Sequence, residues 1–171
     1  MMVDVTYQMV LSTLQTAGLL VGIFYYIMTL NYTRKNQEQT HKTRSATFYN
    51  NIAGQLLSNN EAIKHIGIIQ DNPISSVEEY YELWEQNLEY RIAVTWWWNF
   101  YETIGDYLRE DIIDIGMFAG RHTWFNIWFW EMYKDVIYDH RKRFGPTFFS
   151  NMEYLMNALQ KYLEEHPELA T

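Results

Sequence analysis

The chain contains no cysteine among its 171 residues. This absence excludes disulfide bonds, catalysis by a thiolate, and zinc or iron–sulfur sites held by cysteine. Proline is almost as scarce, with three in the whole sequence, so few segments are barred from the helical conformation. No segment alternates apolar and polar residues as a half-buried strand would, and no Asn-Gly pair marks a hairpin turn. The sequence therefore predicts an all-α protein.

Sequence signatures of catalysis are also missing. There is no glycine-rich phosphate-binding loop, no Gly-x-Ser-x-Gly nucleophile, no His-Glu-x-x-His motif and no pair of Glu-x-x-His metal motifs. Glu61 and His65 form a single pair four residues apart on a short predicted helix. We therefore expect no cofactor and no metal ion, and the sequence specifies no catalytic residue.

Charge is missing from Val5 to Thr33, a run of 29 residues with its apolar centre at Leu11–Leu30. A bilayer core about 30 Å thick needs roughly 20 helical residues to cross it, and a helix satisfies its own backbone there. A cleaved signal peptide would begin with basic residues and have a shorter apolar core, which this run does not. We therefore expect residues 1–33 to form a short external N-terminus and a transmembrane helix. A buried helix of a soluble protein is the alternative, because several polar residues dilute the run.

The charges on either side of this run predict its orientation. Asp4 precedes it, whereas four basic residues follow it closely: Arg34, Lys35, Lys42 and Arg44. The positive-inside rule then places the N-terminus outside and the rest of the chain in the cytoplasm. The prediction is a single-pass protein of the cell membrane, with the lipid bilayer as a partner.

The remainder divides into a polar helical stalk over 34–45 and one cytoplasmic domain over 46–171. Residues 45–171 carry nine basic and nineteen acidic side chains, a net charge of −10. Such an acidic domain is a poor partner for nucleic acid, which needs a basic surface. Its length is enough for one hydrophobic core and too little for two.

Helical periodicity and capping residues predict a bundle of about five helices in this domain. Ser75 with Glu78, or Ser76 with Glu79, forms a capping box at the start of one long helix. Asp111 is the expected cap of a short helix. The expected helices cover 62–71, Val77–Leu108, Ile112–Ala119, His122–Phe144 and Thr147–Glu165.

The predicted membrane helix carries a stripe of small and polar residues. Its members recur at alternating spacings of three and four, namely Gln15, Gly18, Gly22, Tyr25 and Thr29. Two glycines four apart let a second helix approach closely, and the amide of Gln15 favours a hydrogen bond across the gap. The stripe predicts pairing with a second copy or with another membrane protein, although such glycine pairs also occur by chance.

A second stripe lies on the long helix and includes Arg91, Trp98 and Glu102. Glu102 falls within an aromatic block, so its carboxylate is expected to be partly buried and to need a partner. Arg91 is too far along the same helix to reach it, so we expect the partner to be Arg121 or His122. A structural ion pair is the simpler interpretation, and a ligand site is the alternative. On the same helix, Glu78, Glu82, Glu85 and Glu89 indicate a solvated acidic face.

The helix predicted over His122–Phe144 has aromatic rings on nearly every side. A single neighbouring helix cannot cover all of them. Core packing accounts for about half of the rings, and the surplus favours a protein–protein interface or contact with lipid headgroups. Trp124, Trp128 and Trp130 are the candidate interface residues.

Three stretches carry a likeness to known proteins: Phe48-Tyr49-Asn50, Asn99–Gly105 (NFYETIG) and Ile112-Ile113-Asp114. They resemble a broad group of small, single-pass, helical proteins of unknown function from archaea and bacteria. That group typically shows an Asn-Phe-Phe-Glu-x-[Ile/Leu]-Gly-like motif, a short x-Ile-Asp helix and a Trp- or Tyr-rich helix. This chain departs from the group in its three consecutive tryptophans and in lacking a basic residue between Gly105 and Leu108. The resemblance implies the architecture and no activity.

Two functions follow from these patterns. In the first, the chain is a membrane-anchored, non-enzymatic protein that self-associates or joins a membrane complex as an accessory subunit. In the second, the cytoplasmic domain is a sensor or enzyme with a small ligand in an aromatic pocket around Glu102. The glycine stripe, the surplus rings and the missing catalytic motifs favour the first, because a ligand site needs several convergent polar groups.

Overall fold

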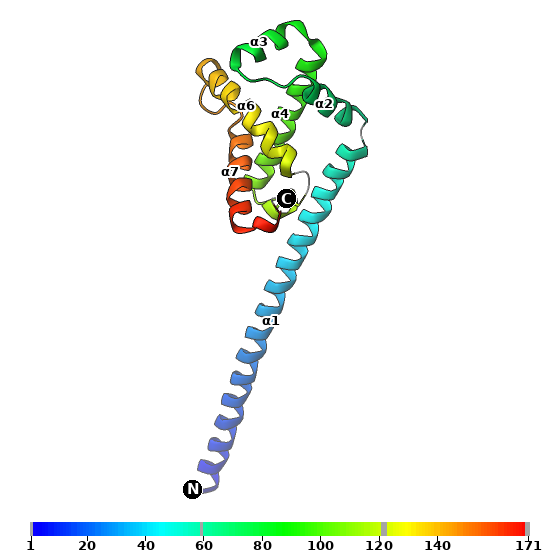
Figure 1. Cartoon of the computed structure of the whole chain (residues 1–171). Coiled ribbons are helices and arrows are strands. Elements are labelled where there is room, and N and C mark those ends of the chain that lie inside the picture. Colours follow the sequence, from blue (N-terminus) through cyan, green and yellow to red (C-terminus); the bar gives the residue numbers. More distant parts are fainter. Residues whose placement is uncertain (1, 59, 121–122, 170–171) are drawn as a thin grey trace. The chain divides into compact units, whose positions relative to one another are not determined.

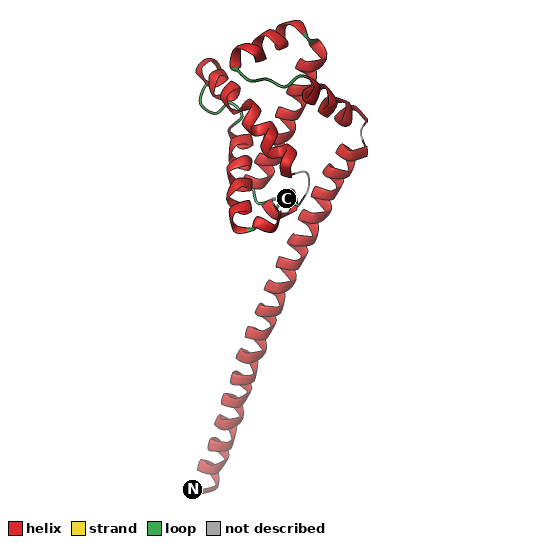
Figure 2. Cartoon of the chain, viewed as in Figure 1, coloured by secondary structure: helices red, strands yellow, loops and turns green. Residues whose placement is uncertain are grey.

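The computed structural model describes residues 2–58, 60–120 and 123–169. Within these ranges the chain is all-helical and has no strand, which confirms the predicted fold class (Figure 2). The chain divides into two compact units, Met1–Arg44 and Ser45–Thr171. We describe each unit by itself.

The first unit is the greater part of helix α1, which runs unbroken over Met2–Ser58 (Figure 1). At about 1.5 Å per residue this 57-residue helix is about 85 Å long. Every side chain described from Thr6 to Arg44 is exposed, including the large apolar ones. The helix is thus long and apolar enough to cross a membrane.

The second unit contains the end of α1 and six further α-helices within the described residues. These are α2 (Asn60–Asp71), α3 (Val77–Gln86), α4 (Leu88–Arg109), α5 (Ile115–Ala119), α6 (Thr123–Phe144) and α7 (Ser150–Glu165), followed by the 3₁₀ turn Pro167–Leu169. The end of α1 joins their core through Phe48, Tyr49 and Ile52, and the ring of Phe48 lies edge-on to Tyr107.

The prediction of one helix over Val77–Leu108 is wrong, because the chain breaks at Asn87. Its backbone is extended, and its side-chain oxygen accepts a hydrogen bond from the Tyr90 N–H at 3.0 Å. The Asn87 N–H in turn donates to the Leu83 carbonyl and ends α3. Because the asparagine caps the next helix, one helix ends and another begins here, although the apolar spacing continues across the break. Glu89 therefore lies on α4 and is not part of the acidic face of α3.

Helix α3 begins with a capping box, in the second of the two predicted registers, Ser76 with Glu79. Ser76 accepts from the Glu79 N–H at 3.2 Å, and the Glu79 carboxylate accepts from the N–H of Ser75 at 2.8 Å. The short helix begins later than predicted, because Asp114 is its cap and accepts from the Gly116 N–H at 2.8 Å. Asp111, the expected cap, instead has a left-handed backbone with φ of 54°.

Helix α4 runs through the middle of the core, and aromatic rings fill the space around it. Tyr90 and Tyr133 share a hydrogen bond of 2.8 Å between their hydroxyls, and Tyr101 donates to the Asn126 side-chain oxygen at 2.8 Å. These pairs satisfy polar groups that would be costly to bury alone. Burial raises the pKa of Tyr90 to about 12 and raises that of Tyr101 as well, so both rings stay neutral.

Helices α4 and α7 approach most closely at Gly105. A methyl group at this position would overlap the backbone carbonyl of Asn151 in the first turn of α7. Only glycine therefore lets the two backbones lie in contact here.

We expect Gly105→Ala to destabilise the second unit by about 2 kcal/mol or more, because α7 must move away from α4. Gly67→Ala is the matched control, since Gly67 lies in α2 with open space around it. The control should stabilise the fold by about 0.5–1 kcal/mol through helix propensity alone. Chemical unfolding of the full chain in detergent measures both changes, and equal effects of the two substitutions would contradict the close contact.

Candidate functional site

The stripe predicted on the membrane helix lies on one side of α1. Gln15, Gly18, Gly22, Tyr25 and Thr29 fall within about 80° of one another at 100° per residue. All are exposed, and a methyl group built on Gly18 or Gly22 meets no atom within 4 Å. The two glycines leave a shallow groove beside the ring of Tyr25, which is 73% exposed. A second helix fits against such a groove.

Two threonine hydroxyls elsewhere on this helix form hydrogen bonds within the helix. Thr13 donates to the Met9 carbonyl at 2.8 Å and Thr16 donates to the Ser12 carbonyl at 2.9 Å. Hydroxyls bonded within their own helix are compatible with lipid. The amide of Gln15 has no hydrogen-bond partner among the described residues. In an apolar surrounding it therefore needs a partner from outside the chain.

The ion pair predicted for Glu102 with Arg121 or His122 stays a prediction, because both partners lie outside the described residues, and the structure gives Glu102 another partner. Its carboxylate accepts a hydrogen bond of 2.8 Å from the backbone N–H of Met152, the third residue of α7. Phe149, which precedes α7, offers no side-chain cap. Glu102 thus takes the place of an N-cap from a neighbouring helix, and its negative charge suits the positive end of the α7 dipole.

Of the other residues of this predicted site, Arg91 and Trp98 are described, and neither forms a hydrogen bond or ion pair with Glu102. Trp98 is buried in the core, 3% exposed, and stacks on Tyr80. Arg91 is half-buried and forms no ion pair with a described residue. Arg121 and His122 lie outside the described residues. No sequence pattern on α4 indicates that Glu102 caps α7, since the cap depends on how the two helices pack.

The turn between α6 and α7 is held by Arg141. Its guanidinium donates to the carbonyls of Phe148 at 2.8 Å and Phe149 at 3.2 Å, and pairs with Glu153 at 2.6 Å. Phe149 has a left-handed backbone with φ of 50°, a strained conformation for this residue. The arginine therefore stabilises a turn that the local sequence disfavours.

Beside this turn lies His140, a half-buried histidine whose buried ring nitrogens the sequence does not predict. The ring of His140 packs edge-on to Tyr80 and Trp98, with centroids 5.8 and 5.6 Å away, and touches Tyr81, Phe144 and Phe148 as well. Both ring nitrogens are buried without a hydrogen-bond partner among the described residues, as are the Tyr80 hydroxyl and the Trp98 indole N–H. A lone histidine in a basic run carries no signal of this burial.

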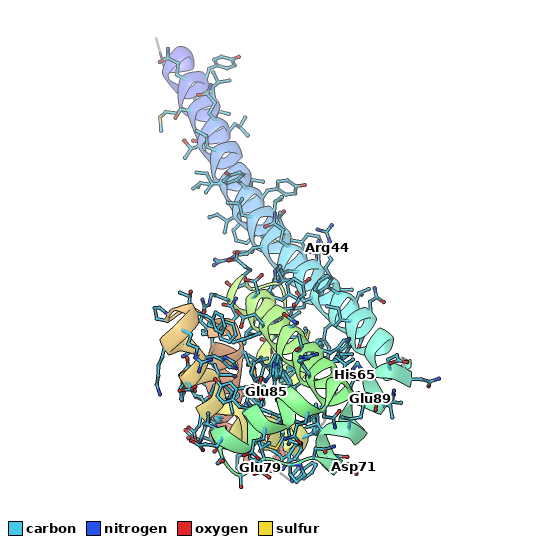
Figure 3. The ribbon with its side chains drawn as sticks, turned by 90° about the horizontal axis from the view of Figure 1, so that it is seen from above. Arg44, His65, Asp71, Glu79, Glu85 and Glu89 are labelled. Atoms are coloured by element: carbon cyan, nitrogen blue, oxygen red, sulfur yellow. The ribbon has the colours of Figure 1, made fainter. Side chains whose placement is uncertain are left out.

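Burial lowers the pKa of His140, and the charge of Arg143 adds to the shift, while the carboxylate of Asp139 opposes it. His65, which Figure 3 labels on α2, is a second such group and is buried. Its ring lies 5.7 Å from that of Trp96, and burial lowers its pKa too, against the opposing charge of Glu61. Both histidines are therefore held in the neutral form.

The candidate interface tryptophans divide between surface and core. Trp124 is 68% exposed and stacks on the half-buried ring of Trp128, with centroids 6.0 Å apart and planes 11° apart. Trp130 is 3% exposed and belongs to the core, so its predicted place at the surface is wrong. Along α6 it turns inward, on the opposite side from Trp128.

Among the described residues, no three side chains of the histidine, aspartate and glutamate types gather closely enough to hold a metal ion. The described residues offer a stripe of small and polar side chains on α1, the exposed Trp124 stacked on the half-buried Trp128, and a helical core.

A protein-family model described as a domain of unknown function, DUF4760, matches residues 12–159. No curated protein and no solved structure matches the chain. The match begins inside the apolar run of α1 and ends within α7, so it includes all of the candidate residues discussed above.

We expect Glu102→Ala to lower the free energy of unfolding by about 1–2 kcal/mol, because α7 loses its cap. Glu102→Gln keeps an oxygen acceptor and should cost less, with the loss coming from the missing charge. Glu82→Ala, on the exposed face of α3, is the control and should change stability by less than about 0.5 kcal/mol. Equal losses for the alanine variants in chemical unfolding would refute the cap.

Acid should destabilise the second unit. A histidine with a lowered pKa in the folded state takes up its proton more readily when unfolded, so stability falls as pH drops below the ordinary histidine pKa of about 6.5. We expect His140→Phe to flatten the loss of stability between about pH 7 and pH 5, while His41→Gln on exposed α1 leaves it unchanged. Unfolding measured across this pH range tests the prediction, and an unchanged slope in His140→Phe would contradict it.

Proposed function

Because this chain belongs to the DUF4760 family, whose match includes both the apolar helix and the helical domain, we propose that the two parts act as one membrane-anchored module. The module works through association with other proteins and without catalysis of its own. Its partners are a second copy of the chain, another membrane protein, or both.

The observation that carries this proposal is the exposure of α1. Large apolar side chains are uncovered along its whole first unit, for example Leu14 at 66% and Phe24 at 67%. Leaving such surface in water costs roughly 25 cal/mol for each Å². Lipid is the solvent that suits it, and the apolar run is long enough to cross a bilayer.

The charges flanking the run support one orientation. Arg34, Lys35, Lys42 and Arg44 follow it, and the acidic residue Asp4 precedes it. The N-terminus is therefore placed outside and the second unit in the cytoplasm, in a single-pass arrangement at the cell membrane.

The stripe through Gly18 and Gly22 is the proposed contact within the membrane. Lipid tails cannot bond to the Gln15 amide, whereas a second helix in the groove can. The alternative of a ligand pocket around Glu102 has less support, because its carboxylate already caps α7 and neither Arg91 nor Trp98 forms a hydrogen bond with it.

We expect Gly18→Ile combined with Gly22→Ile to abolish or strongly weaken this association, since the larger side chains fill the groove. The pair Leu20→Ile and Phe24→Ile, on the other side of α1, is the matched control and should associate normally. The mass of the complex in mild detergent, with its companion chains identified, measures the effect.

The missing cysteines allow a sharper version of this test. A single Gly18→Cys should form a disulfide between copies in the membrane, and a single Leu20→Cys should not, because the bond needs Cβ atoms about 4 Å apart. If the partner is a different protein, the variant with both Gly18→Ile and Gly22→Ile should instead lose that companion chain. Two results would refute the proposal. One is that the unchanged chain is extracted as a monomer without companion chains, and the other is that the Gly18→Ile and Gly22→Ile variant associates as strongly as the unchanged chain.

A further inference from the structure

The outward side of α6 carries a stripe that the core does not use. Trp124, Trp128, Glu131 and Asp135 follow one another at spacings of four, three and four, so they share one side of the helix. The two tryptophan rings stack at one end, and Glu131 and Asp135 are exposed at the other, where Glu131 also forms a surface ion pair with Lys134. We call these four residues the α6 stripe.

The chemistry of the α6 stripe suits a cationic helix. Flat aromatic faces attract guanidinium groups, and carboxylates pair with them in a forked geometry. Pairing of the stripe with its own copy is disfavoured, because Glu131 and Asp135 would bring like charges together. The stripe therefore suits a partner helix whose basic side chains are about as far apart as Trp124 and Asp135, or about 16 Å.

Residues 34–44 of α1, here called the basic segment, have this chemistry. They carry four basic residues against the single acid Glu38 and are exposed throughout. Arg34, Gln37, His41 and Arg44 fall at spacings of three, four and three and share one side of the helix. Neither arginine forms a salt bridge with a described residue, whereas Lys42 pairs with Glu38 at 2.9 Å. Figure 3 shows Arg44 on α1.

We propose that the α6 stripe of one copy binds the basic segment of a second copy. The lengths agree, because Arg34 to Arg44 spans about 15 Å of helix and Trp124 to Asp135 about 16 Å. The charges agree as well, since the second unit has a net charge of −10 and the basic segment is positive. This inference rests on the proposed function, in which a shared membrane raises the local concentration of both copies.

A charge exchange between two full-length variants tests the contact. The first variant combines Arg34→Glu with Arg44→Glu, and the second combines Glu131→Arg with Asp135→Arg. Each alone brings like charges together and should self-associate about tenfold more weakly than the unchanged chain. Mixed, the two variants restore opposite charges at both contacts, so a hetero-complex should regain the original affinity. Fluorescence energy transfer between labelled copies in detergent measures the association of each variant alone and of the mixture.

Two further variants separate this contact from general charge effects. Glu82→Arg combined with Glu85→Arg changes the net charge as the second variant does, but at two exposed positions of α3, and should associate like the unchanged chain. Trp124→Ala keeps every charge and should weaken association several-fold, through loss of the exposed ring. Circular dichroism shows that each variant is folded, as expected for exposed positions.

Failure of the mixed variants to restore association would overturn the inference, as would wild-type association in each charge variant alone. If those charge variants associate normally while Gly18→Ile with Gly22→Ile does not, the inference fails and the proposed function stands. If the unchanged chain does not self-associate but keeps a different companion chain, the inference fails and the proposed function stands. If it is a monomer without any companion chain, both fail.

Discussion

The close approach of α4 and α7 is the constraint on which the second unit depends. Gly105 lets the backbone of α7 lie against α4, and Glu102, three residues earlier on the same side, accepts a hydrogen bond from the Met152 N–H. Both contacts fall in the first turn of α7, so they determine where that helix begins. Arg141 holds the preceding turn from the α6 side, including the left-handed backbone of Phe149. A helix that begins at this point buries Met152, Leu155, Met156 and Leu159 in the core.

A core made largely of rings has a particular weakness, because the polar tips of those rings need partners. Tyr90 with Tyr133, and Tyr101 with Asn126, satisfy one another at 2.8 Å. The corner formed by Tyr80, Trp98 and His140 differs, since its hydroxyl, indole and imidazole nitrogens have no partner among the described residues. Buried polar groups without partners cost free energy, so this corner contributes less to stability than its many ring contacts suggest. It is also the corner where α3 meets α6, through Tyr80, Tyr81 and His140.

The helices could be predicted from the sequence because their signals are local. Apolar spacing, the cap at Ser76 and the scarcity of proline all act within a few residues. The break at Asn87 was missed because an apolar pattern of helical period continues across it, and only the asparagine side chain marks the change. The partner of Glu102, the ring contacts of His140 and the burial of Trp130 depend on residues distant in the sequence. Such contacts follow from the packing of whole helices, which periodicity on one helix does not specify. The stripe on α1 is different, since its geometry is that of a single helix and could be predicted completely.

The order of surfaces along the chain argues for association over catalysis. An apolar exposed run is followed by a basic exposed segment and then by a domain of net charge −10, in which the exposed Trp124 stacks on the half-buried Trp128. The Gln15 amide has no hydrogen-bond partner among the described residues, and the ring of Trp124 leaves apolar area in water. A catalytic site would instead bring several polar groups together in a concave pocket. In the second unit Glu102 is used as a cap, and the buried polar tips of Tyr80, Trp98 and His140 lie among aromatic rings. In the proposed function, a second protein chain beside α1 gives the Gln15 amide its partner and covers part of the exposed apolar surface.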